Sequence, residues 1–131
     1  MQKFENFSKA LQNLEEIIHY QEPYDTVVLT GMVALYEICF EQAWKAVKEV
    51  LDASGYAEGK TGSPKMILKT AYSAGMISDE SLWLSALESR NSAVHAYNEL
   101  TALNIIRDTK EKYIDMFKAL KAEIEQNWLE V

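Results

Sequence analysis

At 131 residues and a formal net charge of −7, the chain is long enough for one domain and too acidic to be a general binder of nucleic-acid backbone. Hydrophobic residues make up 48% of it and charged residues 25%, which excludes a disordered or low-complexity chain. One cysteine cannot form an internal disulfide, and no run of about 18 apolar residues is free of charge, so we expect a single cytoplasmic domain over residues 1–131 that binds neither DNA nor a membrane.

The first predicted helix covers residues 3–19. Its apolar residues recur at steps of three and four, with polar residues between them, which is the pattern of an amphipathic helix. Pro23 prevents the helix from continuing. The residues of the predicted buried stripe are Phe4, Phe7, Leu11, Leu14 and Ile18.

The second predicted helix runs from about residue 25 to residue 54. Asp25 stands where a carboxylate favours a helix N-terminus, and Gly55 stands where a left-handed residue ends one. At about 1.5 Å per residue the helix would be roughly 45 Å long, which suits a bundle or an oligomer. Its apolar stripe consists of Met32, Leu35, Tyr36, Cys39, Phe40, Ala43, Val47 and Leu51.

A loop and three further helices complete the predicted fold. We expect a loop over residues 56–62, then a short helix over residues 64–74 with Ser63 as its N-cap and Pro64 at its first position. A helix capped by Ser78 should run to about Tyr97, and a last one should begin near Thr101. The predicted class is therefore all-α, an antiparallel up-and-down bundle of four long helices plus one short helix. The stripe of the last helix is Leu103, Ile106, Tyr113, Phe117, Leu120, Ile124 and Trp128.

Most residue types that could carry chemistry have a structural explanation. Cys39 lies on an apolar stripe, where a free cysteine usually packs in the core. His19 and His95 are far apart in the chain and have no cysteine or histidine at ligand spacing, so no metal site is expected. The glycines lack the flanking pattern of a phosphate-binding loop.

One stretch, residues 89–97, differs from the rest. On a continuous helix Asn91 and His95 would share a face, and Arg90 and Tyr97 would lie within about 20° of each other. Arginine offers a fork of donors to phosphate oxygens, and histidine can take or give a proton. These residues could recognise or cleave a phosphate ester without a metal, or they could form an ordinary solvated or interface face.

The spacing also resembles a known signature. Arg90 followed after four residues by His95, with Asn91 after the arginine and Tyr97 in a His-x-Tyr sequence, resembles the HEPN superfamily. A more specific likeness, to the nucleotidyltransferase substrate-binding branch, is carried by Phe40–Lys48, Leu51, Gly55, Ser63–Lys65, Ala71, Gly75–Ile77, Trp83–Leu84, Tyr97–Glu99 and Ala102. Gln42 departs from the pattern of this branch, which has an apolar residue at that position.

The resemblance implies a prokaryotic two-component module of toxin–antitoxin type. This chain would form a homodimer, and its partner would be a minimal nucleotidyltransferase that uses ATP and Mg²⁺, while this chain binds no cofactor of its own. Tyr97 would be the acceptor of adenylyl groups, and Arg90, Asn91 and His95 would complete the binding site, with Arg90 and His95 facing a groove shared by two subunits. The chain also has more large aromatic residues than one small bundle would be expected to carry, and a dimer interface would cover those on the surface. These residues are Tyr72, Trp83, Tyr97, Tyr113 and Trp128.

Three functions remain open at this point. The chain could be an accessory subunit that binds the substrate of a nucleotidyltransferase or serves as that substrate. It could be a metal-independent ribonuclease in which His95 is the general base on a 2′-hydroxyl and Arg90 stabilises the developing charge. It could also be a structural dimer without chemistry. In the first two cases a local site would bind a nucleotide or RNA.

Overall fold

The computed structural model describes residues 1–129 and contains helices and connecting turns, with no strand in that range, so the predicted all-α class is confirmed. Two short 3₁₀ segments, Glu16–His19 and Ala93–His95, and a π-helical segment, Thr109–Tyr113, join the α-helices. The α-helices are α1 (Gln2–Glu15), α2 (Thr26–Ala53), α3 (Glu58–Thr61), α4 (Pro64–Ser73), α5 (Glu80–Ser92), α6 (Glu99–Asp108) and α7 (Ile114–Asn127).

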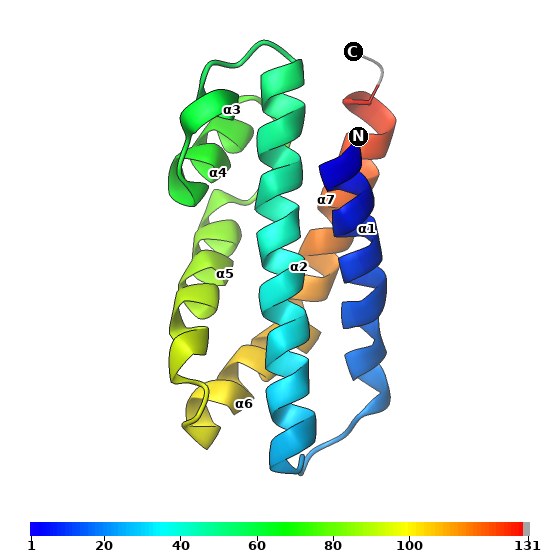
Figure 1. The fold of residues 1–131 in the computed structure, drawn as a ribbon, viewed down its shortest axis with the longest axis vertical. Coiled ribbons are helices and arrows are strands. Elements are labelled where there is room, and N and C mark those ends of the chain that lie inside the picture. The colour runs from blue at the N-terminus through cyan, green and yellow to red at the C-terminus, as the bar shows by residue number, and fades with distance from the viewer. Residues whose placement is uncertain (130–131) are drawn as a thin grey trace.

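The chain crosses the length of the molecule four times. It descends along α1, returns along the whole of α2, descends again through α4 and α5, and climbs through α6 and α7 (Figure 1). The N-terminus and the end of α7 therefore lie near the same end of the molecule. Helix α2 contacts α1, α3, α4, α5 and α6, so it is the element around which the others pack.

Helix α2 has the ends that the sequence predicts. The carboxylate of Asp25 accepts a hydrogen bond from the backbone N–H of Val28 at 2.9 Å, and Gly55 follows the helix with a φ of 92°, a conformation that favours glycine. Among residues 1–129, α2 alone is long and apolar enough to cross a membrane. Here it is the core helix, with buried residues Leu29, Met32, Val33, Tyr36, Cys39, Phe40, Ala43, Ala46, Val47, Val50 and Leu51.

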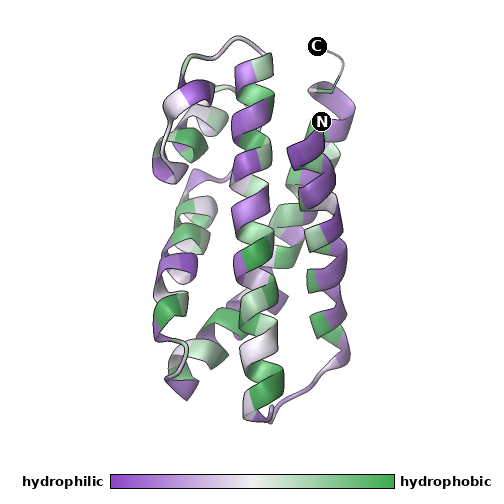
Figure 2. Cartoon of the chain, in the orientation of Figure 1, coloured by the Kyte–Doolittle hydropathy of each residue, from purple (hydrophilic) through white to green (hydrophobic). Residues whose placement is uncertain are grey.

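The core is aromatic, and hydrophobic faces of the helices turn inward to form it (Figure 2). Tyr36 stacks on Tyr113 with ring centroids 5.5 Å apart, and Trp83 meets Phe117 edge to face at 5.6 Å. The expectation that Trp83 and Tyr113 belong to the surface is therefore wrong, because both are needed to fill the centre of the bundle. Cys39 is fully buried, as predicted, and this burial raises the pKa of its thiol.

Several predicted boundaries shift by a few residues. The last turn of the first helix is a 3₁₀ helix with three residues per turn, so Ile17 is buried and Ile18 is exposed. The expected loop over residues 56–62 contains the short helix α3. Asp79 caps α5, with its carboxylate accepting from the N–H of Leu82 at 3.0 Å, in place of the predicted Ser78.

The last predicted helix is interrupted. It begins two residues early, at Glu99, because the side chain of Asn98 accepts from the N–H of Thr101 at 3.2 Å. The π-helical segment Thr109–Tyr113 then separates α6 from α7. At its start the buried hydroxyl of Thr109 donates to the carbonyl oxygen of Ile105 at 2.6 Å, a local bond that competes with the regular helical pattern.

Candidate functional site

The motif residues lie where α5 ends and the chain turns toward α6. The prediction of one helix up to Tyr97 is wrong, because α5 ends at Ser92 and the 3₁₀ segment Ala93–His95 follows. The turn is held by backbone bonds from the N–H of Ala96 to the carbonyl of Ala93 and from that of Asn98 to His95, at 3.1 and 3.0 Å. The expectation that His95 shares a face with Asn91 assumes a continuous helix. The expectation that Tyr97 lies close to Arg90 makes the same assumption, so neither expectation applies.

Arg90 is partly buried on α5 against α2. Its Nη2 lies 3.4 Å from Oε2 of Glu41, and its guanidinium carbon lies 5.7 Å from the centroid of the Phe40 ring. Its Nε–H is buried and has no acceptor within residues 1–129. Glu41 is shared, since Nζ of Lys45 lies 3.7 Å from its other oxygen. Arg90 is thus held in place on one side by Glu41 and Phe40.

His95 and Tyr97 form a second, exposed pair. Their rings meet edge to face with centroids 6.0 Å apart, and the side chain of Tyr97 is the most exposed large hydrophobic one in the described chain, at 87%. Asn91, one residue after Arg90, is also exposed. A phenol hydroxyl in this position is open to a second protein, and a histidine beside it can accept a proton.

The structure brings two of the predicted residues, His95 and Tyr97, into contact and leaves Arg90 apart from them. His95 contacts Tyr97, and Arg90 is held by Glu41, but no hydrogen bond or ion pair within residues 1–129 joins Arg90 to either ring. Glu41 and Phe40 are site residues that the sequence reasoning missed. The sequence indicated only that Glu41 and Lys45 lie four residues apart on one helix. The contact of Glu41 with Arg90 could not be predicted, because it depends on how α2 packs against α5.

Hydrogen bonds inside the bundle fix the position of α5. The hydroxyl of Tyr36 on α2 donates to the carbonyl oxygen of Ala86 at 2.5 Å. The hydroxyl of Tyr113 shares hydrogen bonds with the hydroxyls of Ser85 and Ser89 on α5, at 3.0 and 2.9 Å. The last turns of α5, which carry Arg90, are therefore held from two sides.

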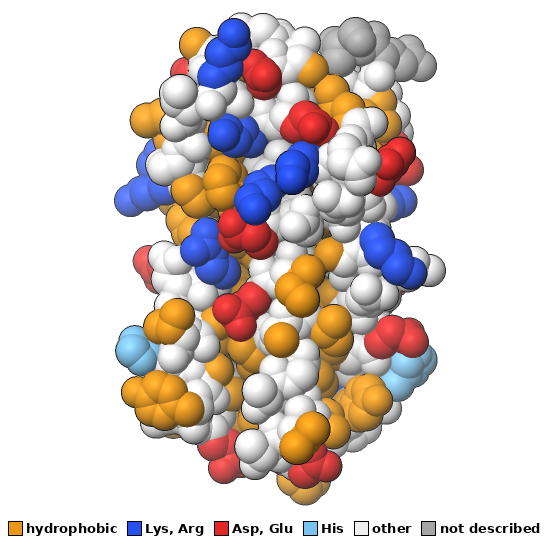
Figure 3. Space-filling model, in the orientation of Figure 1, with side chains coloured by type: hydrophobic (Ala, Val, Ile, Leu, Met, Phe, Trp, Pro, Cys, Tyr) orange, Lys and Arg blue, Asp and Glu red, His pale blue; other side chains and the backbone are white. Residues whose placement is uncertain are grey.

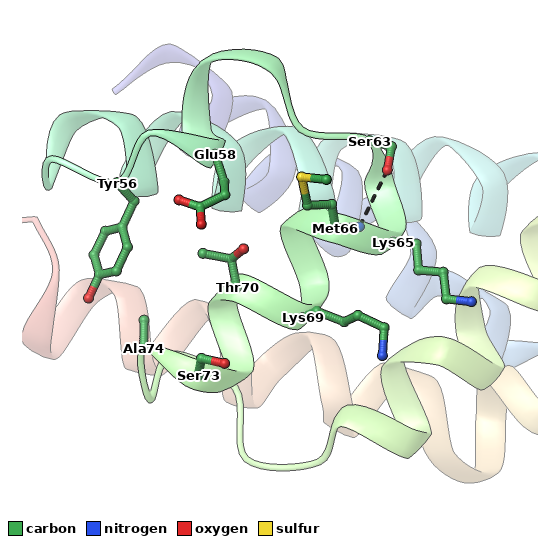
Figure 4. A pocket seen from close by; sticks show the side chains of 9 residues that line it. All are labelled: Tyr56, Glu58, Ser63, Lys65, Met66, Lys69, Thr70, Ser73 and Ala74. Atoms are coloured by element: carbon green, nitrogen blue, oxygen red, sulfur yellow. Dashed lines mark hydrogen bonds between the residues drawn. The ribbon is translucent and has the colours of Figure 1, made fainter.

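A cavity of about 650 Å³ lies elsewhere, along α4 (Figure 4). Ser63 caps α4 by accepting from the N–H of Met66 at 3.4 Å, and Nζ of Lys69 lies 4.0 Å from a carboxylate oxygen of Glu80. The ammonium groups of Lys65 and Lys69 point away from Tyr56 (Figure 4), so the charged and aromatic parts of this cavity do not converge. Within residues 1–129 no group of three or more His, Cys, Asp and Glu side chains is placed to hold a metal ion.

A family model and two solved structures match most of the chain. Residues 2–126 match the family described as nucleotidyltransferase substrate binding protein like. A crystal structure from Thermus thermophilus is 28% identical, with a TM-score of 0.79, and the match covers 92% of this chain and 99% of that one. A structure from Haemophilus influenzae, described as the fold of a substrate binding domain of a nucleotidyltransferase, is 19% identical, with a TM-score of 0.81 and coverage of 94% and 99%, and shows the shared fold. No curated protein matches the chain.

Proposed function

The chain belongs to the nucleotidyltransferase substrate-binding protein family, and from this we propose that it is the accessory subunit of a two-component HEPN module whose other member is a minimal nucleotidyltransferase. The module would be of toxin–antitoxin type. The supporting observations are the match over residues 2–126 and the exposed His95–Tyr97 pair in the turn that follows α5, the helix that carries Arg90. ATP and Mg²⁺ would be bound by the partner, and no cofactor by this chain.

In this proposal Tyr97 is the acceptor of the transferred nucleotide. Its phenol oxygen bonds to the α-phosphorus of ATP, the bond from that phosphorus to the bridging oxygen breaks, and pyrophosphate leaves. The phenolic proton passes to a base, and we assign this role to His95, whose ring meets that of Tyr97 edge to face. The guanidinium group of Arg90 and the side chain of Asn91 would bind phosphate oxygens as the two proteins meet.

A homodimer is the second part of the proposal. Val27, Gly31, Ala34 and Ile38 fall on one exposed stripe of α2, because positions 27 and 38 are about 20° apart on a helical wheel. Hydrophobic side chains also gather on the lower half of this face (Figure 3). We assign this stripe to a second copy of the chain, whose identical stripe would cover it about a two-fold axis.

The test is incubation with the cognate nucleotidyltransferase, ATP and Mg²⁺, followed by mass spectrometry of intact protein and peptides. The wild type should gain one or more adenylyl groups on Tyr97, and Y97F should gain none. Tyr72 is also exposed, so Y72F is the matched control and should be modified like the wild type. An unmodified wild type beside an active partner would reject the acceptor role.

The same preparation tests the ribonuclease alternative. If Arg90 and His95 cleaved RNA, the unmodified chain alone would degrade RNA in the presence of a chelator, and both R90Q and H95N would abolish that activity. We expect no such cleavage, because the chain carries a net charge of −7 and no hydrogen bond or ion pair within residues 1–129 joins Arg90 to His95.

A further inference from the structure

A second cavity, of about 640 Å³, lies on the upper half of the face that Figure 3 shows, where lysine and arginine side chains gather. Four lysines line it: Lys3 from α1, Lys45 and Lys48 from α2, and Lys60 from α3. Trp44, also on α2, supplies an aromatic wall. A volume of this size, within the usual range of about 300–1,000 Å³, is enough for a nucleotide.

The charge of this cavity contrasts with that of the chain. Its wall carries four lysines and only two carboxylates, Glu49 and Asp52, so it has a net charge of +2 in a chain of −7, which leaves −9 for the rest. One of the two carboxylates already has a hydrogen-bond donor within the chain, because Glu49 accepts from the backbone N–H of Lys3 at 3.2 Å. The cavity is therefore a local attractor of anions on an acidic protein.

Most of these lysines have no ionic partner. Nζ of Lys45 lies 3.7 Å from a carboxylate oxygen of Glu41, but Lys3, Lys48 and Lys60 form no ion pair within residues 1–129. Elsewhere in the same range several lysines have a carboxylate within 4.0 Å, for example Lys112 and Lys121. Unpaired cations held close together repel one another, and a bound anion would relieve that repulsion.

Close packing of α3 on α2 holds one wall of the cavity in place. Gly59 on α3 packs directly on the backbone of α2, so closely that a Cβ at this position would lie 2.3 Å from the backbone nitrogen of Asp52. This contact sets the position of the next residue, Lys60, relative to Lys48. The two ammonium groups are thus carried by helices that cannot move apart without losing the packing.

We propose that this cavity binds a nucleoside polyphosphate, with the phosphates on Lys3, Lys48 and Lys60 and the base against Trp44. Lysine binds phosphate as a compact point charge, and indole rings accept the faces of nucleobases. The inference does not rest on the proposed function, because it concerns a site separate from Tyr97 and is tested on this chain without a partner.

The test uses the three tryptophans of the chain as reporters. In an ¹⁵N–¹H correlation spectrum the indole N–H groups of Trp44, Trp83 and Trp128 give three signals, and W44F identifies the one from the cavity. Titration with ATP should shift the Trp44 signal saturably and leave that of Trp83, which lies in the core, unchanged. No shift of the Trp44 signal at millimolar ATP would overturn the proposal.

Lysine variants give the second measurement. K48Q/K60Q should weaken ATP binding by about tenfold or more, since two charge-assisted contacts are lost. The control is K9Q/K65Q, which removes the same charge from two lysines that also form no ion pair within residues 1–129 but lie outside this cavity. Equal weakening in both variants would show a general effect of charge and overturn the assignment. Inorganic triphosphate should bind more weakly than ATP, and equal affinity would overturn the role of Trp44.

Discussion

Two neighbouring side chains of α2, Tyr36 and Cys39, are buried so deeply that burial raises the pKa of both groups. In the unfolded chain they would lose their protons at their usual pKa values, about 10 and 8.5. The unfolded state then binds fewer protons than the folded state, so the free energy of unfolding should fall as the pH rises above about 8.5. Urea denaturation at a series of pH values measures this slope.

The variant C39A separates the two contributions. It should remove the part of the slope that begins near pH 8.5 and keep the part that begins near pH 10, where Tyr36 would ionise. The substitution can lower stability at every pH by leaving a small cavity, so the comparison is between slopes and not between stabilities. Identical slopes for C39A and the wild type would contradict the assignment to the thiol.

At the scale of elements, the contact between α3 and α2 tolerates no added atom at Gly59. A Cβ there would lie 2.3 Å from the backbone nitrogen of Asp52 and 2.6 Å from its Cα, and backbone atoms cannot rotate away. G59A should therefore push α3 off α2 and lower the free energy of unfolding by about 1–3 kcal/mol, as overpacking does. Chemical denaturation followed by circular dichroism measures the loss. K60A, one residue further and exposed, should be nearly neutral, and a neutral G59A would refute the close contact.

At the scale of the whole molecule, the exposed stripe on α2 predicts the oligomeric state. Light scattering of the wild type should give the mass of a dimer, and I38E should give a monomer with an unchanged helical spectrum, because a buried carboxylate would face its own copy across the two-fold axis. Ile38 is 53% exposed in the single chain, and Met66 on α4 is 51% exposed, so M66E is a matched control that should remain dimeric. A monomeric wild type at micromolar concentration would remove the dimer.

The sequence by itself determined the helical class, most helix ends and most of the core. These depend on local chemistry: the cap at Asp25, the positive φ at Gly55, and a stripe with helical spacing that places Cys39 inside. The chemistry and spacing of residues 89–97, together with the family resemblance, also pointed to Arg90 and Tyr97 as candidate site residues. Apart from the resemblance, each of these signals is contained within a few turns of chain.

The tertiary structure alone decided where α5 ends and what surrounds the motif. No glycine or proline marks the turn after Ser92; it forms because the chain must reverse so that α6 can pack on α2. The partner of Arg90, Glu41, comes from another helix, and the lysine cavity is assembled from three helices. Such contacts join positions as distant as Tyr36 and Ala86, 50 residues apart, and they follow from packing that local periodicity does not encode.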